Sequence, residues 1–228
     1  MLKVKKVVDS LREIVFGLED GMVSTLGAIT GIGIASDNHY VIILSGLVII
    51  SVESVSMAVG AYLANRSVIE VEKKEVRQEK KEVANQPKEE RQELEDIYRQ
   101  QGWPAALAID MARVASENPK LFLEEMVTHE LRLPVRPKDH SILSAFFMFC
   151  SYILGGLIPL LPYFFWSNAP ARLLSIIVTM LGLFILGSWT TRITGQRWWK
   201  VGLRMVLLGG VAIVIGWLVG RLSPMAIG

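Results

Sequence analysis

The 228-residue sequence contains a single cysteine, Cys150, so no disulfide can form within the chain. Charge is also missing over long stretches, because no Asp, Glu, Lys or Arg occurs in residues 21–36, 38–52, 54–65, 140–171, 173–191 and 205–220. Of the 46 charged residues (24 basic and 22 acidic), 30 lie between Arg66 and Asp139. A soluble globular protein distributes charge along its whole sequence, so this segregation excludes an ordinary soluble enzyme.

The uncharged stretches are long enough to cross a bilayer. A spanning helix needs roughly 20 apolar residues. Lipid offers no hydrogen bonds to the backbone, so a span must be a helix or a strand of a closed barrel. These stretches lack the alternation of barrel strands. We therefore expect an all-α membrane protein with five transmembrane helices, at residues 14–35, 40–65, 141–165, 171–191 and 201–220.

The same pattern predicts three regions. Residues 1–65 would form an N-terminal amphipathic helix at the membrane surface and the first two spans. Residues 66–137 would form an acidic helical domain inserted between spans two and three, and residues 138–228 the last three spans. The N-terminus does not resemble a signal peptide, because its basic residues are followed by Asp9, Arg12 and Glu13 rather than by an apolar core.

Basic residues predict the orientation in the membrane. They are frequent in the N-terminal segment, in residues 66–138 and in residues 192–204, and rare in the other two loops. The positive-inside rule then places the N-terminus and residues 66–137 in the cytosol. Compact loops and the lack of a targeting extension favour a prokaryotic plasma membrane over a vacuole. Aromatic residues typical of a membrane interface lie at the predicted helix ends: Trp166, Trp189, Trp198 and Trp199.

An acidic stripe marks the start of the inserted domain. On a helical wheel, four glutamates fall within an arc of roughly 80°, while the lysines and Arg77 cover the opposite side. Like charges three or four residues apart repel one another, so a solvated helix would normally interleave its signs. The stripe therefore predicts that something positive faces it. Its members are Glu72, Glu75, Glu79 and Glu82.

More carboxylates follow Pro87, which suits the start of a helix, and a last short helix carries Glu125, Met126, His129 and Glu130. Carboxylates with an occasional methionine suit Mn²⁺ or Fe²⁺ better than Cu⁺. The sequence has no EF-hand loop and no cysteine pair for zinc. A charged, solvated helical hairpin that separates the membrane from a partner is the alternative interpretation of this domain.

Three polar or soft side chains lie within the first two predicted spans. An ionisable residue inside a span costs about 2.5–3.5 kcal/mol to insert, which makes Asp20 a candidate functional residue. Glu53 and Met57 lie four residues apart on one face of the second span. Gly27 and Gly31 form a Gly-xxx-Gly pair that would let another span, or a second subunit, approach closely.

The third predicted span contains Gly155, Gly156, Pro159 and Pro162, which we expect to interrupt helix regularity at membrane depth. Tyr152 and Tyr163 could supply hydroxyl groups there.

Several segments resemble the vacuolar iron transporter family and its nodulin-like relatives. They are GLEDGMVSTLGAITGI in the first span, SMAVGAYLANRS in the second, GGLIPLLPY in the third and GGVAIVIGWLVG in the fifth. The charged insert has the family's size and glutamate pattern. The segments occur in the family's order and cover almost the whole chain.

This resemblance implies a homodimer of five-span subunits that exports Fe²⁺ from the cytosol in exchange for protons. Mn²⁺ accepts the same oxygen ligands and is the alternative metal. The resemblance also implies that the protein is not an enzyme and needs no cofactor beyond the transported metal. Its partners would be membrane lipid and the metal ion, and no nucleic acid would bind. Val127 replaces the second methionine of the family's Met-Met-x-x-Glu pattern. By position, the metal ligands of the cytosolic domain would be Glu79, Glu82, Glu90, Glu93, Met126 and Glu130.

In the membrane, the family's aspartate and methionine correspond to Asp20 and Met57, and we add Glu53 from this sequence alone. Carboxylates that bind either the metal ion or a proton would couple export of the metal to import of protons. One alternative is a membrane-anchored scaffold whose charged domain binds a protein. Another is a membrane oxidase with iron in the carboxylate cluster, but a di-iron site requires Glu-x-x-His and Glu125 is four residues from His129.

Overall fold

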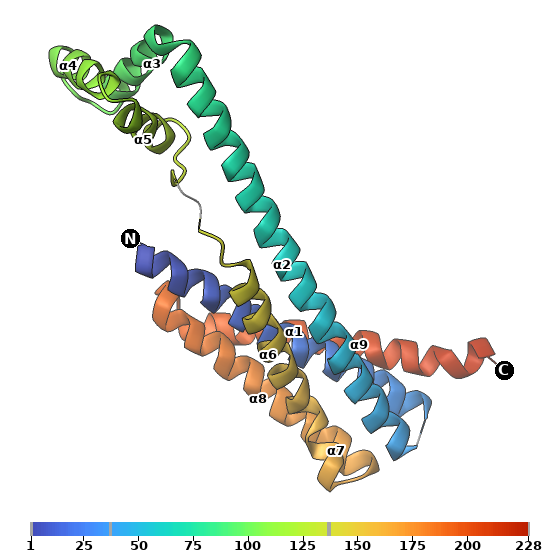
Figure 1. Cartoon of the computed structure of the whole chain (residues 1–228). Coiled ribbons are helices and arrows are strands. Elements are labelled where there is room, and N and C mark those ends of the chain that lie inside the picture. The colour runs from blue at the N-terminus through green and yellow to red at the C-terminus, as the bar shows by residue number, and fades with distance from the viewer. Residues whose placement is uncertain (1, 37, 136–137, 228) are drawn as a thin grey trace. The chain divides into compact units, whose positions relative to one another are not determined.

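The computed structural model describes residues 2–36, 38–135 and 138–227, and this part of the chain is entirely helical outside its turns and connections (Figure 1). The all-α prediction is therefore confirmed. The helices in chain order are α1 (Leu2–Ala35), α2 (His39–Asn85), α3 (Pro87–Gln100), α4 (Ala105–Ser116), α5 (Pro119–His129), α6 (Ser141–Leu160), α7 (Pro162–Phe165), α8 (Asn168–Thr194) and α9 (Trp198–Ile227).

Four helices in the described part of the chain are long and apolar enough to cross a membrane. They are α2, α6, α8 over Ala169–Thr194, and α9 over Trp198–Leu222. Many of their large apolar side chains are exposed, including Val52, Ile185 and Leu207 at 63–65%. A water-soluble protein does not expose apolar surface on this scale, whereas lipid accommodates it. Helix α1, which carries Glu19 and Asp20, is not among the four.

The chain divides into two compact units. One contains Met1–Leu63 together with Ser141–Gly228, and the other contains Ala64–His140. Helix α2 contributes its first part to one unit and its last part to the other. We call them the membrane unit and the acidic unit and describe each by itself.

Helix α1 runs without a break from Leu2 to Ala35. The separate N-terminal surface helix expected from the sequence is therefore continuous with the predicted first span. No helix breaker interrupts residues 2–35, because the segment contains no proline and its glycines are spaced singly, so the backbone hydrogen bonds continue through them.

The glycines of α1 are used for packing inside the chain. A Cβ added at Gly17 would lie 2.8 Å from Cβ of Ser151 on α6, and one at Gly31 would lie 2.7 Å from the carbonyl oxygen of Gly216 on α9. Gly27 similarly faces Ala212 of α9, at 3.1 Å from its carbonyl oxygen. Of the two partners expected for this glycine-rich face, another span or a second subunit, the structure shows a span, α9 of the same chain.

The third predicted span is interrupted at one point only. Helix α6 continues through Gly155, Gly156 and Pro159 to Leu160, and α7 begins at Pro162. The predicted interruption is therefore present at Pro162, and the prediction is wrong for the two glycines and for Pro159. A Cβ on Gly155 would lie 2.9 Å from Cα of Leu18, so this glycine allows α1 to approach α6 closely.

The acidic unit consists of the end of α2 with three short helices. Helices α3 and α5 both begin with proline, and the Asn118 side chain caps α5 by accepting hydrogen bonds from the amides of Lys120 and Leu121, at 3.1 and 3.3 Å. Between α3 and α4, Gly102 adopts a positive φ of 95°. The unit has a small core, with three alanines among its members: Val83, Leu94, Tyr98, Ala108, Ala112, Ala115, Phe122 and Met126.

Candidate metal centre and intramembrane polar network

Three carboxylates from three helices meet in the acidic unit. Glu79 comes from α2, Glu90 from the first turn of α3, and Glu130 from the C-terminal end of α5. Each offers an oxygen that lies within 4.8 Å of the others. Glu79 and Glu90 are buried, with 2% and 8% of their surface exposed. The end of α2, the Pro87 start of α3 and the end of α5 together position the group.

The cluster concentrates negative charge in a poorly solvated place. Burial, followed by repulsion from Glu130 and Glu90, raises the pKa of Glu79 to about 8. Burial also raises the pKa values of Glu90 and Glu130, with Glu93 as the next contributor to both. A buried carboxylate stays charged only when a cation compensates its charge, and otherwise it is neutralised by a proton. Near neutral pH the cluster therefore holds a proton when no cation is present.

Two oxygens of the cluster lack hydrogen-bond partners. Glu79 Oε1 and Glu130 Oε2 are buried and unpartnered within the described residues. A buried acceptor without a partner costs free energy, so the arrangement favours a cation that would bind these oxygens. Oxygen ligands of this kind suit hard or borderline divalent ions such as Mn²⁺ and Fe²⁺.

The other predicted metal ligands of this domain do not all lie with the three clustered carboxylates. Glu82 and Glu93 are outside the group of three, but their negative charges contribute to the raised pKa of Glu90. Met126 is completely buried in the core of the unit, one helical turn before Glu130. Val127 is also fully buried, so an aliphatic side chain occupies the position where the family pattern has a second thioether.

The predicted acidic stripe faces inward on α2. Glu79 is buried and Glu72, Glu75 and Glu82 are partly buried, while Arg77 and most of the lysines opposite are exposed. The expectation that a positive group faces the stripe is not met by a side chain. In the described part of the chain, Glu79 instead meets the carboxylates of Glu90 and Glu130.

A hydrogen-bonded network orients α5 next to the cluster. The hydroxyl of Tyr98 donates to Glu125 Oε2 at 2.7 Å, and the same oxygen lies 3.2 Å from His129 Nε2. His129 Nδ1 lies 2.9 Å from Nε2 of Gln101. Glu125 and His129 therefore pair with each other, which leaves neither in the carboxylate group and disfavours a di-iron oxidase.

A polar network also exists inside the membrane unit. Tyr152 of α6 is completely buried, and its hydroxyl donates to Glu53 of α2. The same hydroxyl lies 2.5 Å from Oγ of Ser24 on α1. The tyrosine thus joins three helices through one oxygen, and it fixes the position of the Glu53 carboxylate.

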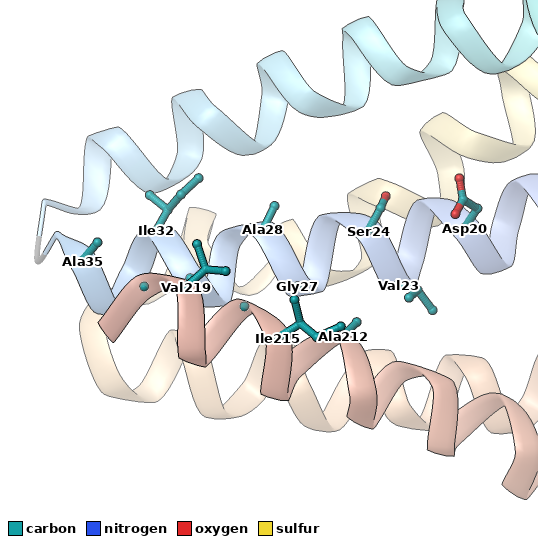
Figure 2. Close-up of a pocket in the computed structure, with 13 residues that line it drawn as sticks. Asp20, Val23, Ser24, Gly27, Ala28, Ile32, Ala35, Ala212, Ile215 and Val219 are labelled. Carbon is teal, nitrogen blue, oxygen red and sulfur yellow. The ribbon is translucent and has the colours of Figure 1, made fainter. Parts of the chain in front are cut away.

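Asp20 lies one helical turn before Ser24 on α1. Figure 2 shows the Asp20 carboxylate and the Ser24 hydroxyl on the side of α1 that faces away from α9. Asp20 lies near enough to Glu53 for their charges to repel one another. It also lines a groove of about 540 Å³ whose other walls are mostly small residues of α1 and α9, including Gly27 and Gly216.

Met57 lies one turn after Glu53 on α2 and is half-buried. It is not among the described residues that line the Asp20 groove. The structure therefore brings together Asp20, Glu53 and Ser24 with Tyr152, and leaves Met57 at the edge of this network.

Sequence reasoning missed Ser24 and Tyr98 and named Tyr152 only as a source of a hydroxyl. Ser24 could have been found, because it follows Asp20 by four residues and so shares its helix face. Tyr98 had no comparable signal, since its partner Glu125 is 27 residues away on another helix.

The fold and these two groups of residues define a multi-pass helical membrane protein with an inserted carboxylate-rich helical unit. Residues 11–221 match the model of the VIT family. The chain is 30% identical over 203 residues to vacuolar iron transporter 1 of Oryza sativa subsp. japonica, covering 89% of this chain and 81% of that protein. It is 30% identical over 211 residues to the vacuolar iron transporter of Centaurea cyanus, covering 90% and 84%.

A vacuolar iron transporter from Plasmodium berghei is 29% identical over 224 residues, covering 94% of this chain and 82% of that protein. The family match covers most of the chain, and the relatives from plants and an apicomplexan align over most of their own lengths. The chain belongs to the VIT family, as its motifs indicated.

Proposed function

We propose that this protein transports Fe²⁺ or Mn²⁺ across a membrane, out of the cytosol and in exchange for protons. The observation that carries the proposal is the group formed by Glu79, Glu90 and Glu130, whose carboxylate oxygens lie within 4.8 Å of one another. The names of the relatives, which are iron transporters, support the choice of iron. A transporter of this family carries out no enzymatic step.

The proposal includes α1 as a fifth span. Support comes from its contacts, because α1 packs along its length against α6 and α9, which both meet the criterion for a membrane span. Gly17 and Gly31 bring it into backbone contact with these helices. The charges of Glu19 and Asp20 lower its hydropathy. Asp20 is then a functional charge inside or at the edge of the membrane, whereas Glu19 would reach the lipid headgroups.

Metal would first be captured by the acidic unit. Cluster carboxylates attract divalent cations, and binding displaces the proton that the raised pKa of Glu79 retains near neutral pH. Glu82, Glu93 and Met126 would complete the ligand set on entry of the metal. The unit thereby concentrates the substrate on the cytosolic side, in the orientation that the basic residues predict.

The path itself would use Asp20, Glu53 and Met57. Asp20 and Glu53 repel each other when both are charged, so a divalent cation or a proton between them is favourable. Competition of metal and proton for the same carboxylates couples the outward movement of one to the inward movement of the other. Tyr152 would keep Glu53 in position.

We further propose that the functional form is a homodimer. The groove that Asp20 lines is open, and a second copy would enclose it. Because Gly27 and Gly31 contact α9 in the same chain, the interface would use the outer rim of this groove and not the glycines. Location in a prokaryotic plasma membrane stays a prediction, since the relatives are named as vacuolar.

The test is transport in proteoliposomes that contain the full chain and a metal-sensitive dye. Fe²⁺ and Mn²⁺ should enter faster when a pH gradient drives protons in the opposite direction. Asp20→Asn keeps the shape of the side chain but removes its charge, and Met57→Ala removes the thioether. Each should lose most of the transport, while metal binding by the acidic unit is unchanged.

Glu19→Gln is the matched control, because it removes the neighbouring carboxylate of the same helix, which does not line the groove. This variant should transport at a rate near that of the unaltered protein. Full transport by Asp20→Asn would exclude the role given to Asp20, and Glu53 would then be the next carboxylate to test. Absence of transport by the unaltered protein would favour the scaffold alternative.

A further inference from the structure

The connection between α8 and α9 lies at a membrane surface, because both helices are candidate spans and only residues 195–197 separate them. Helix α8 ends where Gly195 adopts a left-handed φ of 68°, and the Gly195 amide donates to the carbonyl of Thr191 at 2.9 Å. The connection is therefore a tight turn that brings the end of one span next to the start of the other.

A cavity of about 540 Å³ lies at this turn. Its walls combine apolar groups with one cation and two hydroxyl-bearing residues, Ser188 and Thr191. Ile185, 65% exposed, lies at the apolar end, two turns before Arg192 on α8. The wall residues used here are Phe184, Ile185, Ser188, Trp189, Arg192 and Trp198.

The cavity walls are held by close packing of the two helices. A Cβ added at Gly187 would lie 2.9 Å from Cα of Gly202, so the helix backbones touch beside the cavity. The rings of Phe184 and Trp198 meet edge to face, with centroids 6.0 Å apart at an interplanar angle of 84°. This packing orients the Trp198 indole, which remains 58% exposed.

The charges that α8 and α9 place near the cavity are all positive. The sequence from His140 to Gly228 contains no Asp or Glu, while Arg192, Arg197, Lys200 and Arg204 surround the turn. None of these four forms an ion pair within the described part of the chain. The first turn of α9 also has no acidic residue, and the dipole at the start of this helix favours an anion.

We propose that this cavity binds the headgroup of an anionic phospholipid. The phosphodiester would lie between Arg192 and the start of α9, beside Ser188, whose hydroxyl donates to the carbonyl of Trp198 at 3.4 Å. Trp189 and Trp198 would hold the glycerol region, as tryptophan does at membrane interfaces. One acyl chain would then follow the exposed apolar surface of α8 past Ile185 toward the bilayer interior.

Charge complementarity favours an anionic lipid over a protein as the occupant of this cavity. Anionic lipids are enriched in the cytosolic leaflet, which is the side that the basic residues predict for this turn. A cavity that is apolar at one end and cationic at the other matches an amphiphile with a negatively charged head. A soluble anion would use the cations and leave the apolar end unoccupied.

The test measures bound lipid on the detergent-solubilised full chain by native mass spectrometry. Equal amounts of dioleoyl phosphatidylglycerol and dioleoyl phosphatidylcholine are offered together. The unaltered protein should retain the anionic lipid with a preference of about fivefold or more, since each cation near the membrane surface contributes this order of selectivity. Arg192→Gln and Trp198→Ala should each reduce the preference toward equal binding.

Two variants serve as controls. Arg192→Lys keeps the charge and should retain most of the preference. Arg221→Gln removes a cation that lies over Trp217, 5.1 Å from its ring centroid, outside the cavity, and should bind as the unaltered protein does. Unchanged selectivity in Arg192→Gln, or an equal loss in Arg221→Gln, would overturn the proposal. Displacement of the lipid by inorganic phosphate alone would instead identify a simple anion site and also overturn it.

Discussion

Gly31 of α1 and Gly216 of α9 face each other so closely that a Cβ added to Gly31 would lie 2.7 Å from the carbonyl oxygen of Gly216. Gly220 continues this contact along the same side of α9. Backbone contact of this kind depends on the absence of a side chain at each position. It ties the helix that carries Asp20 to one of the candidate spans within a single chain.

Gly216→Ala should therefore destabilise the protein, because the new methyl group would force α1 and α9 apart. Overpacking typically costs about 1–3 kcal/mol. Gly210→Ala is the control on the same helix, since nothing lies within 4 Å of a Cβ there. Thermal unfolding in detergent should give a lower midpoint for Gly216→Ala only. A normal midpoint combined with dissociation of a dimer would place this contact between subunits instead.

The raised pKa of Glu79 predicts how metal binding depends on pH. Because the carboxyl is protonated below about pH 8, metal must displace a proton there. Affinity for Mn²⁺ should fall by up to about tenfold per pH unit as the pH drops below 8. Isothermal titration calorimetry of the full chain at several pH values measures this slope and the proton released.

Glu79→Gln should bind Mn²⁺ at least about tenfold more weakly and should lose the pH slope near 8, because no proton remains to be displaced. Glu117→Gln alters an exposed carboxylate of the same unit that pairs with Arg113, and it should bind normally. A pH slope near 8 that persists in Glu79→Gln would assign the proton to another group.

Without metal, the same raised pKa predicts that stability decreases as the solution becomes more alkaline. The folded form retains the Glu79 proton up to about pH 8, whereas the unfolded chain releases it near the ordinary glutamate pKa of 4.5. Stability from this group is therefore complete below pH 4.5 and is lost as the pH rises to about 8. Chemical unfolding in a chelator should follow this trend, and Glu79→Gln should flatten it. A metal-free protein that became more stable between pH 5 and 8 would contradict it.

Tyr152→Phe removes the hydroxyl that joins Glu53 and Ser24 while it keeps the buried ring. A buried group left without its partner costs about 1–3 kcal/mol, so Glu53 should lose its fixed position. Transport in proteoliposomes should decrease by about tenfold with normal expression. Tyr163→Phe changes another buried tyrosine outside this network and should transport normally. Equal rates for the two variants would remove Tyr152 from the mechanism.

Local patterns in the sequence were sufficient for the helices. The uncharged stretches identified the four helices that meet the criterion for a span, and Pro87 marked the start of α3. The family was also identified correctly from its motifs. These features depend on neighbours within a few residues, so the order of residue types along the chain predicts them.

Glycine was the residue type whose role the sequence alone did not reveal. Gly155 and Gly156 were expected to break α6, but a helix flanked by close neighbours retains its hydrogen bonds through glycine. Gly27 and Gly31 were expected to let another span or a second subunit approach, and they lie against α9, more than 180 residues away. A glycine indicates that another segment can pack closely against the helix, but it does not indicate which segment.

The sequence by itself determined the segregation of charge, the helical class and the family, because hydropathy and short motifs are properties of the chain read in order. Only the tertiary structure decided which carboxylates meet. It brought Glu79, Glu90 and Glu130 together from three helices and left Glu82 and Glu93 outside the group. It also joined Tyr152 to Ser24 and Glu53, 128 and 99 residues away. Contacts of this kind depend on how the helices pack. Packing in turn depends on the shapes of side chains that lie on segments distant in the sequence.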